Sequence, residues 1–407
     1  MTNHFDIAIV GGGMVGASLA LMFNHALNPV KVALIEAKAF QASTKTSDAG
    51  LTSFDLRSTA LAPTTVTAMQ KLGVWHTMQA YATAIDKIYV SDRGHFGRAV
   101  FTPQDNAGSP LGYVVENRGL GVALVKAVQQ ASGVHVLAPF EVCSVEHQAN
   151  AVSLLSNDQK KISARLLVIA DGADSLLRSQ LGIAEKRTDY QQTAIVVNVE
   201  TEQAHKACAY ERFTQKGPLA LLPLDGAQGK RSAVVWTQDT EQANATLALD
   251  DAGFLCALQQ VFGHKLGRIL KVGERAHYPL SLRVAQEQVR SNLVLMGNAA
   301  HFLHPVAGQG FNLAVRDALR LIDTLKEEDI KDIGRLSALQ KYELAQLRDQ
   351  DRTIALSNGF NQVFRHPSKI VALMRNIGLS AIEHHPMVRH LFLAQLSGQA
   401  ESQARAL

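Results

Sequence analysis

Three glycines near the N-terminus have a spacing that suits phosphate binding. Gly11, Gly13 and Gly16 match the pattern G-x-G-x-x-G and follow the mostly apolar segment of residues 5–10. In such a turn the first glycine allows the tight bend, the second lets the backbone approach a pyrophosphate, and the third allows close helix–strand packing. Anions are favoured there because the first N–H groups of a helix are unpaired and its dipole is positive. We therefore expect Gly11, Gly13, Val15 and Gly16 to contact a dinucleotide.

An acidic residue follows at the sequence separation that is typical of a ribose-binding carboxylate. Glu36 ends a second apolar run, 20 residues after Gly16. A carboxylate at this point accepts hydrogen bonds from the adenosine ribose and repels a 2′-phosphate. The elements that must position these residues are a strand at 5–10, a helix at 14–25 and a strand at 30–36, which form a βαβ unit. This unit predicts a dinucleotide site but does not separate NAD from FAD.

Two later segments also carry glycines and polar residues. In the first, Asp171 follows an apolar run at 166–170; the second covers residues 297–318. Together with the first glycine turn, they resemble the FAD-dependent aromatic hydroxylases, the family of p-hydroxybenzoate hydroxylase. Within the family the chain is similar to the ubiquinone-biosynthesis branch, above all to the 2-polyprenyl-6-methoxyphenol hydroxylases. The segments that carry this similarity are residues 54–57, 91–95, 211–214, 217–220 and 297–300.

The resemblance implies an enzyme that hydroxylates an aromatic ring with FAD as its cofactor. NAD(P)H or another electron donor reduces the flavin, O₂ adds to form a C4a-hydroperoxyflavin, and the ring of a polyprenylated phenol takes up one oxygen. Other ubiquinone-biosynthesis proteins are expected partners. Two alternatives stay open: a related flavin monooxygenase acting on a different small aromatic, and a non-catalytic flavin-binding scaffold in a biosynthetic assembly.

The resemblance also implies cofactor contacts for single residues. Arg57 and Arg118 match family arginines that contact the FAD phosphates or frame the flavin entrance; surface salt bridges are the alternative. Asp171 matches a residue near the FAD phosphate and adenine, or else it orients Arg178. Asn298 stands where the wider family has an aspartate that binds a ribityl hydroxyl, and an amide can still make that hydrogen bond.

A helix is expected to begin near Gly310 and Phe311. Its N–H groups would face the flavin pyrimidine edge, where the helix dipole stabilises the reduced anion. Gly308 and Gly310 would let the backbone pass close to the ring. We expect Gly308, Gly310, Phe311 and Asn312 to contact the cofactor.

The loop before this helix holds the expected catalytic residues, His304, Pro305 and Gly308, which the resemblance places over the reactive face of the flavin. Either His301 or His304 could assist phenol deprotonation, although a structural role is the favoured interpretation of each. No metal site is expected, because no nearby carboxylate completes the histidine pair.

The remaining pattern predicts an α/β fold. We expect a Rossmann-like FAD-binding domain, an inserted and mostly antiparallel β-sheet substrate domain, and a C-terminal helical segment. The expected FAD-binding domain comprises residues 1–84, 113–186 and 285–330, the substrate domain 85–112 and 187–284, and the helical region 331–407. Residues 41–62 are predicted to be a long loop and residues 194–200 a strand.

Composition narrows the class of protein further. The chain has 407 residues, 47% apolar and 19% charged, which excludes a disordered protein. Its net charge is +4 and no run of five basic residues occurs, so no nucleic-acid partner is expected. Three separated cysteines suit a reducing compartment, and no apolar stretch of about 18 residues predicts a spanning helix. We expect a cytoplasmic protein.

The C-terminal part leaves two interpretations open. Apolar residues are frequent between 370 and 396. They suit a helix packed on the body of the protein, or a surface that contacts the inner face of the membrane or a partner, including a second copy in a homo-oligomer.

Overall fold

A computed structural model of the chain describes residues 3–27, 29–40, 57–303, 308–365 and 368–397. Its first sheet has eight strands, in the order β18-β19-β11-β1-β2-β8, with β10 and β9 added beside β11. The strands β19, β11, β1, β2 and β8 run parallel. Their bounds, with the antiparallel additions, are β1 (Asn3–Val10), β2 (Val32–Ile35), β8 (Val134–Leu137), β9 (Val142–His147), β10 (Val152–Ser156), β11 (Lys161–Ile169), β18 (Val289–Arg290) and β19 (Leu293–Leu295).

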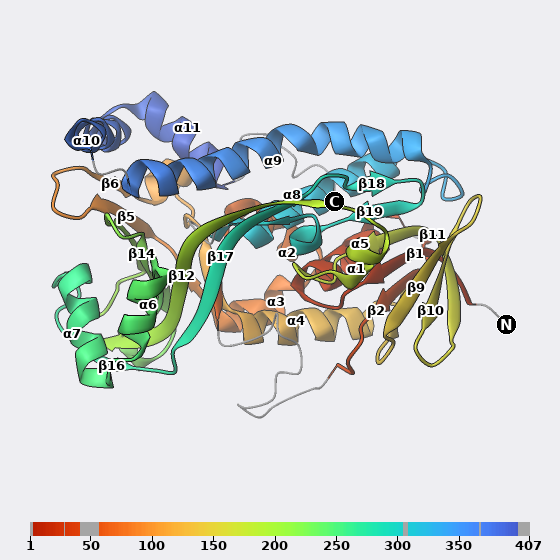
Figure 1. Cartoon of the computed structure of the whole chain (residues 1–407), viewed down its shortest axis with the longest axis horizontal. Coiled ribbons are helices and arrows are strands. Elements are labelled where there is room, and N and C mark those ends of the chain that lie inside the picture. Colours follow the sequence, from red (N-terminus) through yellow and green to blue (C-terminus); the bar gives the residue numbers. More distant parts are fainter. Residues whose placement is uncertain (1–2, 28, 41–56, 304–307, 366–367, 398–407) are drawn as a thin grey trace.

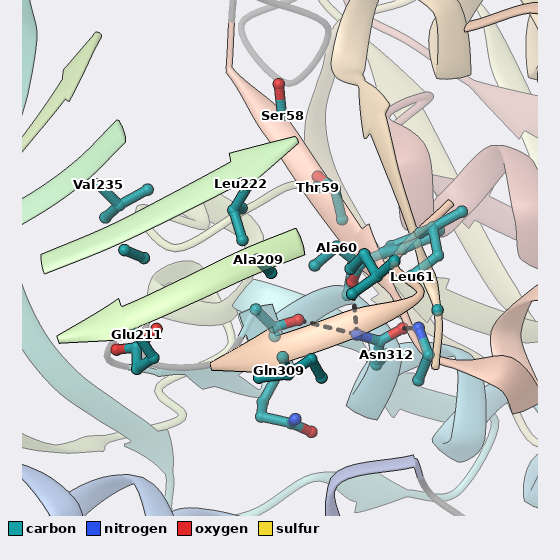
Figure 2. Close-up of a pocket in the computed structure, with 18 of the residues that line it drawn as sticks. Ser58, Thr59, Ala60, Leu61, Ala209, Glu211, Leu222, Val235, Gln309 and Asn312 are labelled. Carbon is teal, nitrogen blue, oxygen red and sulfur yellow. Dashed lines mark hydrogen bonds between the residues drawn. The ribbon is translucent and has the colours of Figure 1, made fainter. Parts of the chain in front are cut away.

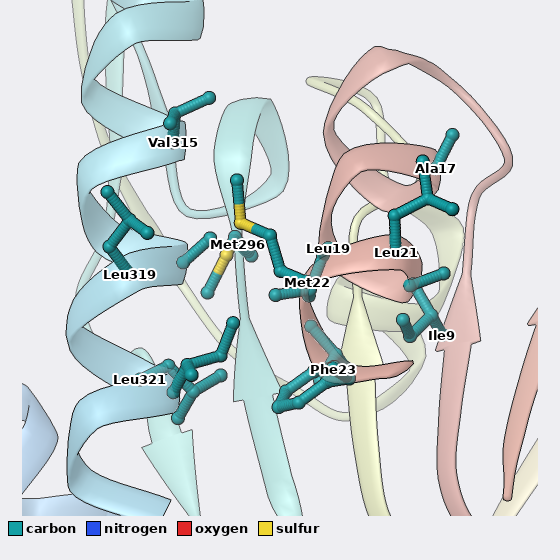
Figure 3. Packing of buried hydrophobic residues seen from close by; sticks show 14 of the residues in the cluster. Ile9, Ala17, Leu19, Leu21, Met22, Phe23, Met296, Val315, Leu319 and Leu321 are labelled. Carbon is teal, nitrogen blue, oxygen red and sulfur yellow. The ribbon is translucent and has the colours of Figure 1, made fainter. Parts of the chain in front are cut away.

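Helices cover this sheet and form the main core. The principal ones are α1 (Met14–Ala26), α4 (Asn117–Gln130) and α8 (Gln309–Leu325). Figure 3 shows Met22 and Phe23 of α1 facing Leu319 and Leu321 of α8, with Met296 between the helices. Burial of these side chains fixes α8 against the first glycine turn, since α1 begins at that turn.

A second sheet has nine strands, in the order β20-β17-β12-β15-β14-β13-β5-β6, with β16 beside β12. All described pairs in it are antiparallel except β13 with β5. Its strands are β5 (Lys87–Asp92), β6 (Arg98–Phe101), β12 (Glu185–Thr201), β13 (Cys208–Phe213), β14 (Leu219–Leu224), β15 (Arg231–Asp239), β16 (Ile269–Val272), β17 (Ala276–Ala285) and β20 (His301–Phe302).

Two helices that the sequence pattern did not predict cover one face of the second sheet. They are α6 (Thr240–Leu247) and α7 (Asp251–Phe262), and α7 starts where the Asp250 side chain accepts a hydrogen bond from the Gly253 N–H. Phe254 of α7 packs edge-on against Trp236 of β15. The opposite face of the sheet is therefore left for a cavity.

The paired strands β12 and β17 run through the middle of the molecule, between the first sheet and the far side of the second (Figure 1). The prediction for β12 covered residues 194–200, but the strand begins at Glu185. The alternation of apolar and polar residues did not indicate this start, because the register of the strand pair shifts between Asp189 and Gln192. Such a bulge changes which residues face the core. No strand was predicted at β17, where Pro279 interrupts the apolar alternation.

A third, three-stranded sheet lies in the order β3-β7-β4, formed by β3 (Ser58–Leu61), β7 (Tyr113–Glu116) and β4 (Ala82–Ala84). The prediction of a loop over residues 41–62 was wrong at its end, because Ser58–Leu61 pairs with β7. The rest of that loop, residues 41–56, lies outside the described residues.

Short elements connect these sheets: α2 (Pro63–Lys71), α3 (Trp75–Met78), η1 (Gln79–Tyr81), η2 (Pro103–Asn106), α5 (Leu176–Gln180), η3 (Ala227–Gly229) and η4 (Gly297–Ala299). The C-terminal part is helical, as predicted, with α9 (Leu336–Arg365), α10 (Lys369–His384) and α11 (Pro386–Ser397). The helices α10 and α11 lie over β5 and β6 (Figure 1). In the described part of the chain, no helix is both long and apolar enough to cross a membrane.

Candidate active site

Four of the segments singled out in the sequence leave the same edge of the first sheet. Val10 pairs with both Ile35 and Ile169, and Ile169 pairs with Leu295, so four parallel strands end level with one another. The segments that follow these strand ends begin at Gly11, Glu36, Ala170 and Met296. The carboxyl edge of a parallel sheet is where ligands bind in α/β folds.

The first glycine turn is packed so closely, within itself and against Ala170, that two of its positions have no room for a side chain. A Cβ at Gly16 would lie 1.9 Å from the Gly11 carbonyl oxygen, and a Cβ at Gly11 would lie 2.4 Å from that of Ala170. No side chain fits at either distance. Gly13 has φ −68°, an ordinary value, so its backbone conformation alone does not require glycine. Glu36 lies at the turn, where its Oε2 accepts a hydrogen bond of 2.8 Å from the Gly12 N–H.

The second and third segments are joined to this turn by packing. Gly297 has φ +61°, and a Cβ there would lie 3.0 Å from Cγ2 of Val15. Arg178 donates to the Ala299 carbonyl and forms an ion pair of 2.7 Å with Glu185. Its ion-pair partner is Glu185, and its charge also acts on Asp171. Burial raises the pKa of Asp171, although hydrogen bonding from Ser175 and the charge of Arg178 work against that rise.

The start of α8 is held by a single amide. Oδ1 of Asn312 accepts from the Ala62 N–H at 2.9 Å and from the Thr65 hydroxyl at 2.8 Å, while its NH₂ group donates to the Ala60 and Gly308 carbonyls. Figure 2 shows Asn312 beside Ala60 and Leu61 of β3. These four bonds use the full hydrogen-bonding capacity of an asparagine side chain. Asn312 therefore fixes β3 against the helix start.

The backbone at the start of α8 leaves room beside it. Gly308 precedes the helix in the left-handed conformation, with φ +60°. A Cβ at Gly310 would meet no atom within 4 Å. The first turn of α8 contains no acidic residue, and its leading N–H groups have no intrahelical acceptor. An anionic or electron-rich group placed there would be stabilised.

A cavity of about 520 Å³ connects this helix start with the second sheet. One side, here called the helix wall, consists of Ser58–Leu61 and Gly308–Asn312. The opposite side, here called the sheet wall, presents alternate residues of five strands, with Val90, Val196, Glu211, Ala220 and Val235 forming one cross-strand row. Figure 2 shows Ala209, Glu211, Leu222 and Val235 on the sheet wall, and Thr59, Ala60 and Asn312 across from them.

The cavity brings together only some of the predicted site residues. Those that line it are Arg57, Asn298, Gly308, Gly310, Phe311 and Asn312. The Arg57 guanidinium lies over the ring of Tyr278, 4.7 Å from its centroid. The residues Gly11, Gly13, Val15, Gly16, Glu36 and Asp171 lie instead at or beside the carboxyl edge of the first sheet. Arg118 is half-buried in the first turn of α4, where the described residues give it no hydrogen-bond or ion-pair partner.

Comparisons with known sequences and structures indicate a flavin-binding protein, as the geometry of the site does. A family model described as "FAD binding domain" matches residues 4–349. The chain belongs to this FAD-binding family. A ubiquinone hydroxylase UbiL of Rhodospirillum rubrum is 33% identical over 400 residues, which are 97% of this chain and 89% of the relative. The 3-demethoxyubiquinol 3-hydroxylase of Escherichia coli is 29% identical over 404 residues, which are 98% of this chain and 100% of the relative.

Solved structures of flavoproteins share the fold. The p-nitrophenol 4-monooxygenase PnpA of Pseudomonas putida matches with a TM-score of 0.76 at 17% identity, over 98% of this chain and 99% of that one. HpxO of Klebsiella pneumoniae, solved with FAD and uric acid, matches with a TM-score of 0.73 at 19% identity, over 96% and 97%. These identities support the fold alone. With the hydroxylase relatives, the family membership makes this flavoprotein an FAD-dependent monooxygenase.

The residues of this FAD-binding protein fit the cofactor. The tight turn at Gly11 and Gly16 places the N-terminus of α1 at the sheet edge, where a pyrophosphate can reach its N–H groups. The free space at Gly310 leaves the first turn of α8 open to a planar ring. Arg118 offers a cation without a partner among the described residues, as a phosphate ligand would require.

Some predicted residues cannot be placed. The expected catalytic residues His304 and Pro305 lie outside the described residues, as does most of segment 54–57. His301 is buried, and its Nε2 lies 2.7 Å from Oδ2 of Asp317 in α8. It does not line the cavity, so the structure supports its structural role.

The sequence analysis assigned no role to the residues of the sheet wall. Segment 211–214 was noticed for its resemblance, but not as a cavity lining. The available signal was the alternation of Ala209, Glu211 and Phe213 on one face of a strand, although a single strand does not reveal what that face meets.

The role of segment 91–95 was missed as well. Asp92 forms a buried ion pair with Arg375 of α10, with Oδ2 3.0 Å from Nη2 and both side chains at most 3% exposed. Asn376 accepts a hydrogen bond from the Gly97 N–H. The segment therefore holds the C-terminal helices in place, and Leu379, Ile382 and Leu393 of those helices line the cavity.

Proposed function

We propose that this FAD-dependent monooxygenase hydroxylates the ring of a polyprenylated phenol in ubiquinone biosynthesis. The observation that carries the proposal is the continuous cavity between the helix wall and an almost wholly apolar sheet wall. The apolar lining suits a phenol ring with a hydrocarbon substituent, and the ubiquinone hydroxylases among the relatives support the substrate class. Leu379, Ile382 and Leu393 of the C-terminal helices line the cavity, where they would contact a long hydrocarbon tail.

The chain's own residues would have separate tasks in this reaction. Gly11, Gly13, Gly16 and the α1 N-terminus would bind the pyrophosphate, with Glu36 on the adenosine ribose. Arg57, Arg118, Asp171 and Asn298 would hold the remaining polar parts of FAD. Gly308, Gly310 and Phe311 would face the ring system, while Asn312 fixes the helix start. His304 and Pro305 remain proposed as parts of the loop over the reactive face.

Bound FAD supplies electrons from NAD(P)H or another donor and activates O₂, so that one oxygen atom enters the ring and the other leaves as water. The protein must keep bulk water from the reacting atoms. The apolar sheet wall does this once a substrate fills the cavity. The first turn of α8 would stabilise negative charge on the flavin edge.

We propose the division into domains on the same basis. Residues 1–84, 113–186 and 285–330 would form the FAD-binding domain, residues 85–112 and 187–284 the substrate domain, and residues 331–407 the helical region. Membership of β5 and β6 in the second sheet supports the assignment of 85–112 to the substrate domain.

A peripheral contact with the inner face of the membrane is part of the proposal. Four large apolar side chains of α10 and α11 are more than half exposed: Leu373 (54%), Met374 (66%), Ile377 (56%) and Met387 (68%). Such a surface would deliver a membrane-soluble substrate to the cavity. Other ubiquinone-biosynthesis proteins or a second copy of the chain are further proposed partners of this surface.

Point variants test this contact better than removal of the C-terminus, because removal would leave Asp92 buried without Arg375. We expect the Met374→Glu/Met387→Glu protein to lose flotation with anionic liposomes while retaining FAD. Equal flotation of the variant and the wild type would contradict the membrane contact.

The substrate class is tested with the FAD-loaded protein and a series of phenols. We expect NAD(P)H-dependent hydroxylation of a 2-prenylphenol and slower turnover of phenol and 4-nitrophenol. Ala220→Phe, which fills the sheet wall, should abolish turnover but retain FAD, whereas Ala149→Phe on an exposed turn should behave as wild type. Faster turnover of the unprenylated phenols would favour a different small aromatic as substrate.

A further inference from the structure

The sheet wall contains one acidic residue among its apolar neighbours. Glu211 pairs with Ala220 of β14 on one side and with Val90 of β5 on the other. The row continues through Val235 and Val196. Paired residues of neighbouring strands share a face, so the Glu211 carboxylate projects into the cavity from a wall of methyl groups.

No described residue pairs with this carboxylate. The structure gives Glu211 neither a hydrogen bond nor an ion pair among the residues that it describes. The other acidic residue of the cavity, Asp105, forms an ion pair with Arg389, which holds the pKa of Asp105 below its usual value. Elsewhere, the buried Asp92 and Asp349 have arginine partners. Glu211 is therefore an exception to the rule that buried charges are paired.

The surroundings alter the chemistry of Glu211. Burial raises its pKa to about 7, from an ordinary value of 4.5. Glu211 is partly exposed because it borders the cavity. Strands β14 and β5 flank it on the two sides of β13. A carboxylate with this pKa is a stronger base than an ordinary glutamate, and near neutral pH it can either accept or donate a hydrogen bond.

We propose that Glu211 binds the phenolic hydroxyl of the substrate and removes its proton as the ring is hydroxylated. This inference rests on the proposed function and assigns a catalytic residue to it. The phenol O–H bond breaks, its proton moves to a carboxylate oxygen of Glu211, and the electron pair stays on the phenol oxygen. That pair delocalises to the ring carbons ortho and para to the oxygen, which become more nucleophilic. Glu211 itself is neither oxidised nor reduced, and it returns the proton to water after the product leaves.

The same placement selects among aromatic substrates. A neutral phenol supplies the hydrogen bond that Glu211 lacks, whereas an aromatic carboxylate would bring a second negative charge into an apolar wall. The other titratable groups that line the cavity are Arg57, Asp105, Tyr210 and Tyr278. In the described part of the chain, no hydrogen bond or ion pair joins any of these groups to Glu211, so the effect of pH on binding should follow Glu211.

Binding to the oxidised FAD holoenzyme tests the proposal without turnover. The two probes are 2-prenylphenol and its methyl ether, which has no hydroxyl proton, and the readout is the change in flavin absorbance between pH 5.5 and 8.5. We expect wild-type protein to prefer the phenol by about tenfold above pH 7, corresponding to one charge-assisted hydrogen bond, and to lose this preference at pH 5.5. Glu211→Gln, whose amide oxygen still accepts a hydrogen bond, should show a smaller preference for the phenol that does not change with pH. Its kcat/KM for the phenol should fall about 100-fold, as for loss of a general base.

Thr237→Val provides a matched control, because Thr237 lines the same cavity without an ionisable side chain. It should keep the pH-dependent preference. Should Glu211→Gln lose FAD, Glu211→Ala supplies the same comparison. A Gln variant that retains both the pH-dependent preference and the rate would overturn the role of Glu211 while leaving the proposed function intact. Wild-type protein that neither binds nor hydroxylates the phenol would overturn the proposed function, and this inference with it.

Discussion

The two walls of the cavity are built from different parts of the polypeptide. The helix wall includes backbone that two glycines leave open, Gly308 and Gly310 at the start of α8, and this start is held by four hydrogen bonds of the Asn312 side chain to the segments on either side. The sheet wall consists of side chains on alternate positions of neighbouring strands. Open backbone at a helix start suits the cofactor, which is the same in every member of an enzyme family. A wall made of side chains can change its specificity without changing the fold.

The largest expected effect concerns the support of the sheet wall. Arg375→Ala leaves Asp92 charged and buried without its partner, so we expect the free energy of unfolding to fall by about 3–5 kcal/mol. The measurement is chemical denaturation of the FAD holoenzyme. Lys271→Ala removes an exposed ion pair with Glu200 and should change stability by about 1 kcal/mol or less. Equal changes in the free energy of unfolding for the two variants would show that the buried Asp92–Arg375 ion pair does not hold α10 in place.

The cofactor side is tested next, at Gly13. Its φ of −68° tolerates a side chain, so Gly13→Val should fold and should lose FAD, because the side chain would occupy the proposed position of the pyrophosphate. We expect the affinity for FAD to fall about 100-fold or more, equivalent to about 2.7 kcal/mol. Titration of the apo-protein with FAD measures it. Gly378→Val, at an exposed helix position with no atom near its Cβ, should bind FAD normally; full FAD content in both variants would contradict the phosphate assignment.

A pH-dependent stability change is expected at Glu211. Its folded pKa is raised, so the folded state binds more protons than the unfolded state between pH 4.5 and about 7, and stability falls as the pH rises through that window. Glu211→Gln removes this penalty and should stabilise the protein by about 2 kcal/mol at pH 8, with little effect at pH 4.5. Thermal unfolding at both pH values checks it. A gain that is independent of pH would mean that Glu211 is not buried as a charge.

The smallest effect is expected at Gly310. The position has room for a methyl group, so Gly310→Ala should leave the fold and the stability of the apo-protein unchanged. The methyl group would lie where the flavin approaches α8, and we expect about tenfold weaker FAD binding, or about 1.4 kcal/mol. Unchanged affinity and an unchanged flavin spectrum would place the ring away from this helix start.

The same contrast explains how far the sequence could be interpreted. Gly11, Gly16 and Gly308 are needed for their backbone geometry, so these glycines stand at fixed spacings in the sequence. For this reason the first βαβ unit, α8 and the family could be predicted. The role of Glu211 can be recognised only when the pairing of β13 with β14 and β5 is known. Arg375 and Asp92 are 283 residues apart, and no local pattern links them. The bulge in β12 and the helices α6 and α7 also depended on contacts that the sequence alone does not show.

The most direct test of the central claim is the yield of hydroxylated product when reduced FAD holoenzyme reacts once with O₂. In the presence of 2-prenylphenol we predict about one hydroxylated phenol for each flavin oxidised, and mostly hydrogen peroxide when the methyl ether replaces the phenol. The same yield of peroxide with the phenol, with the ether and without either compound would contradict the account.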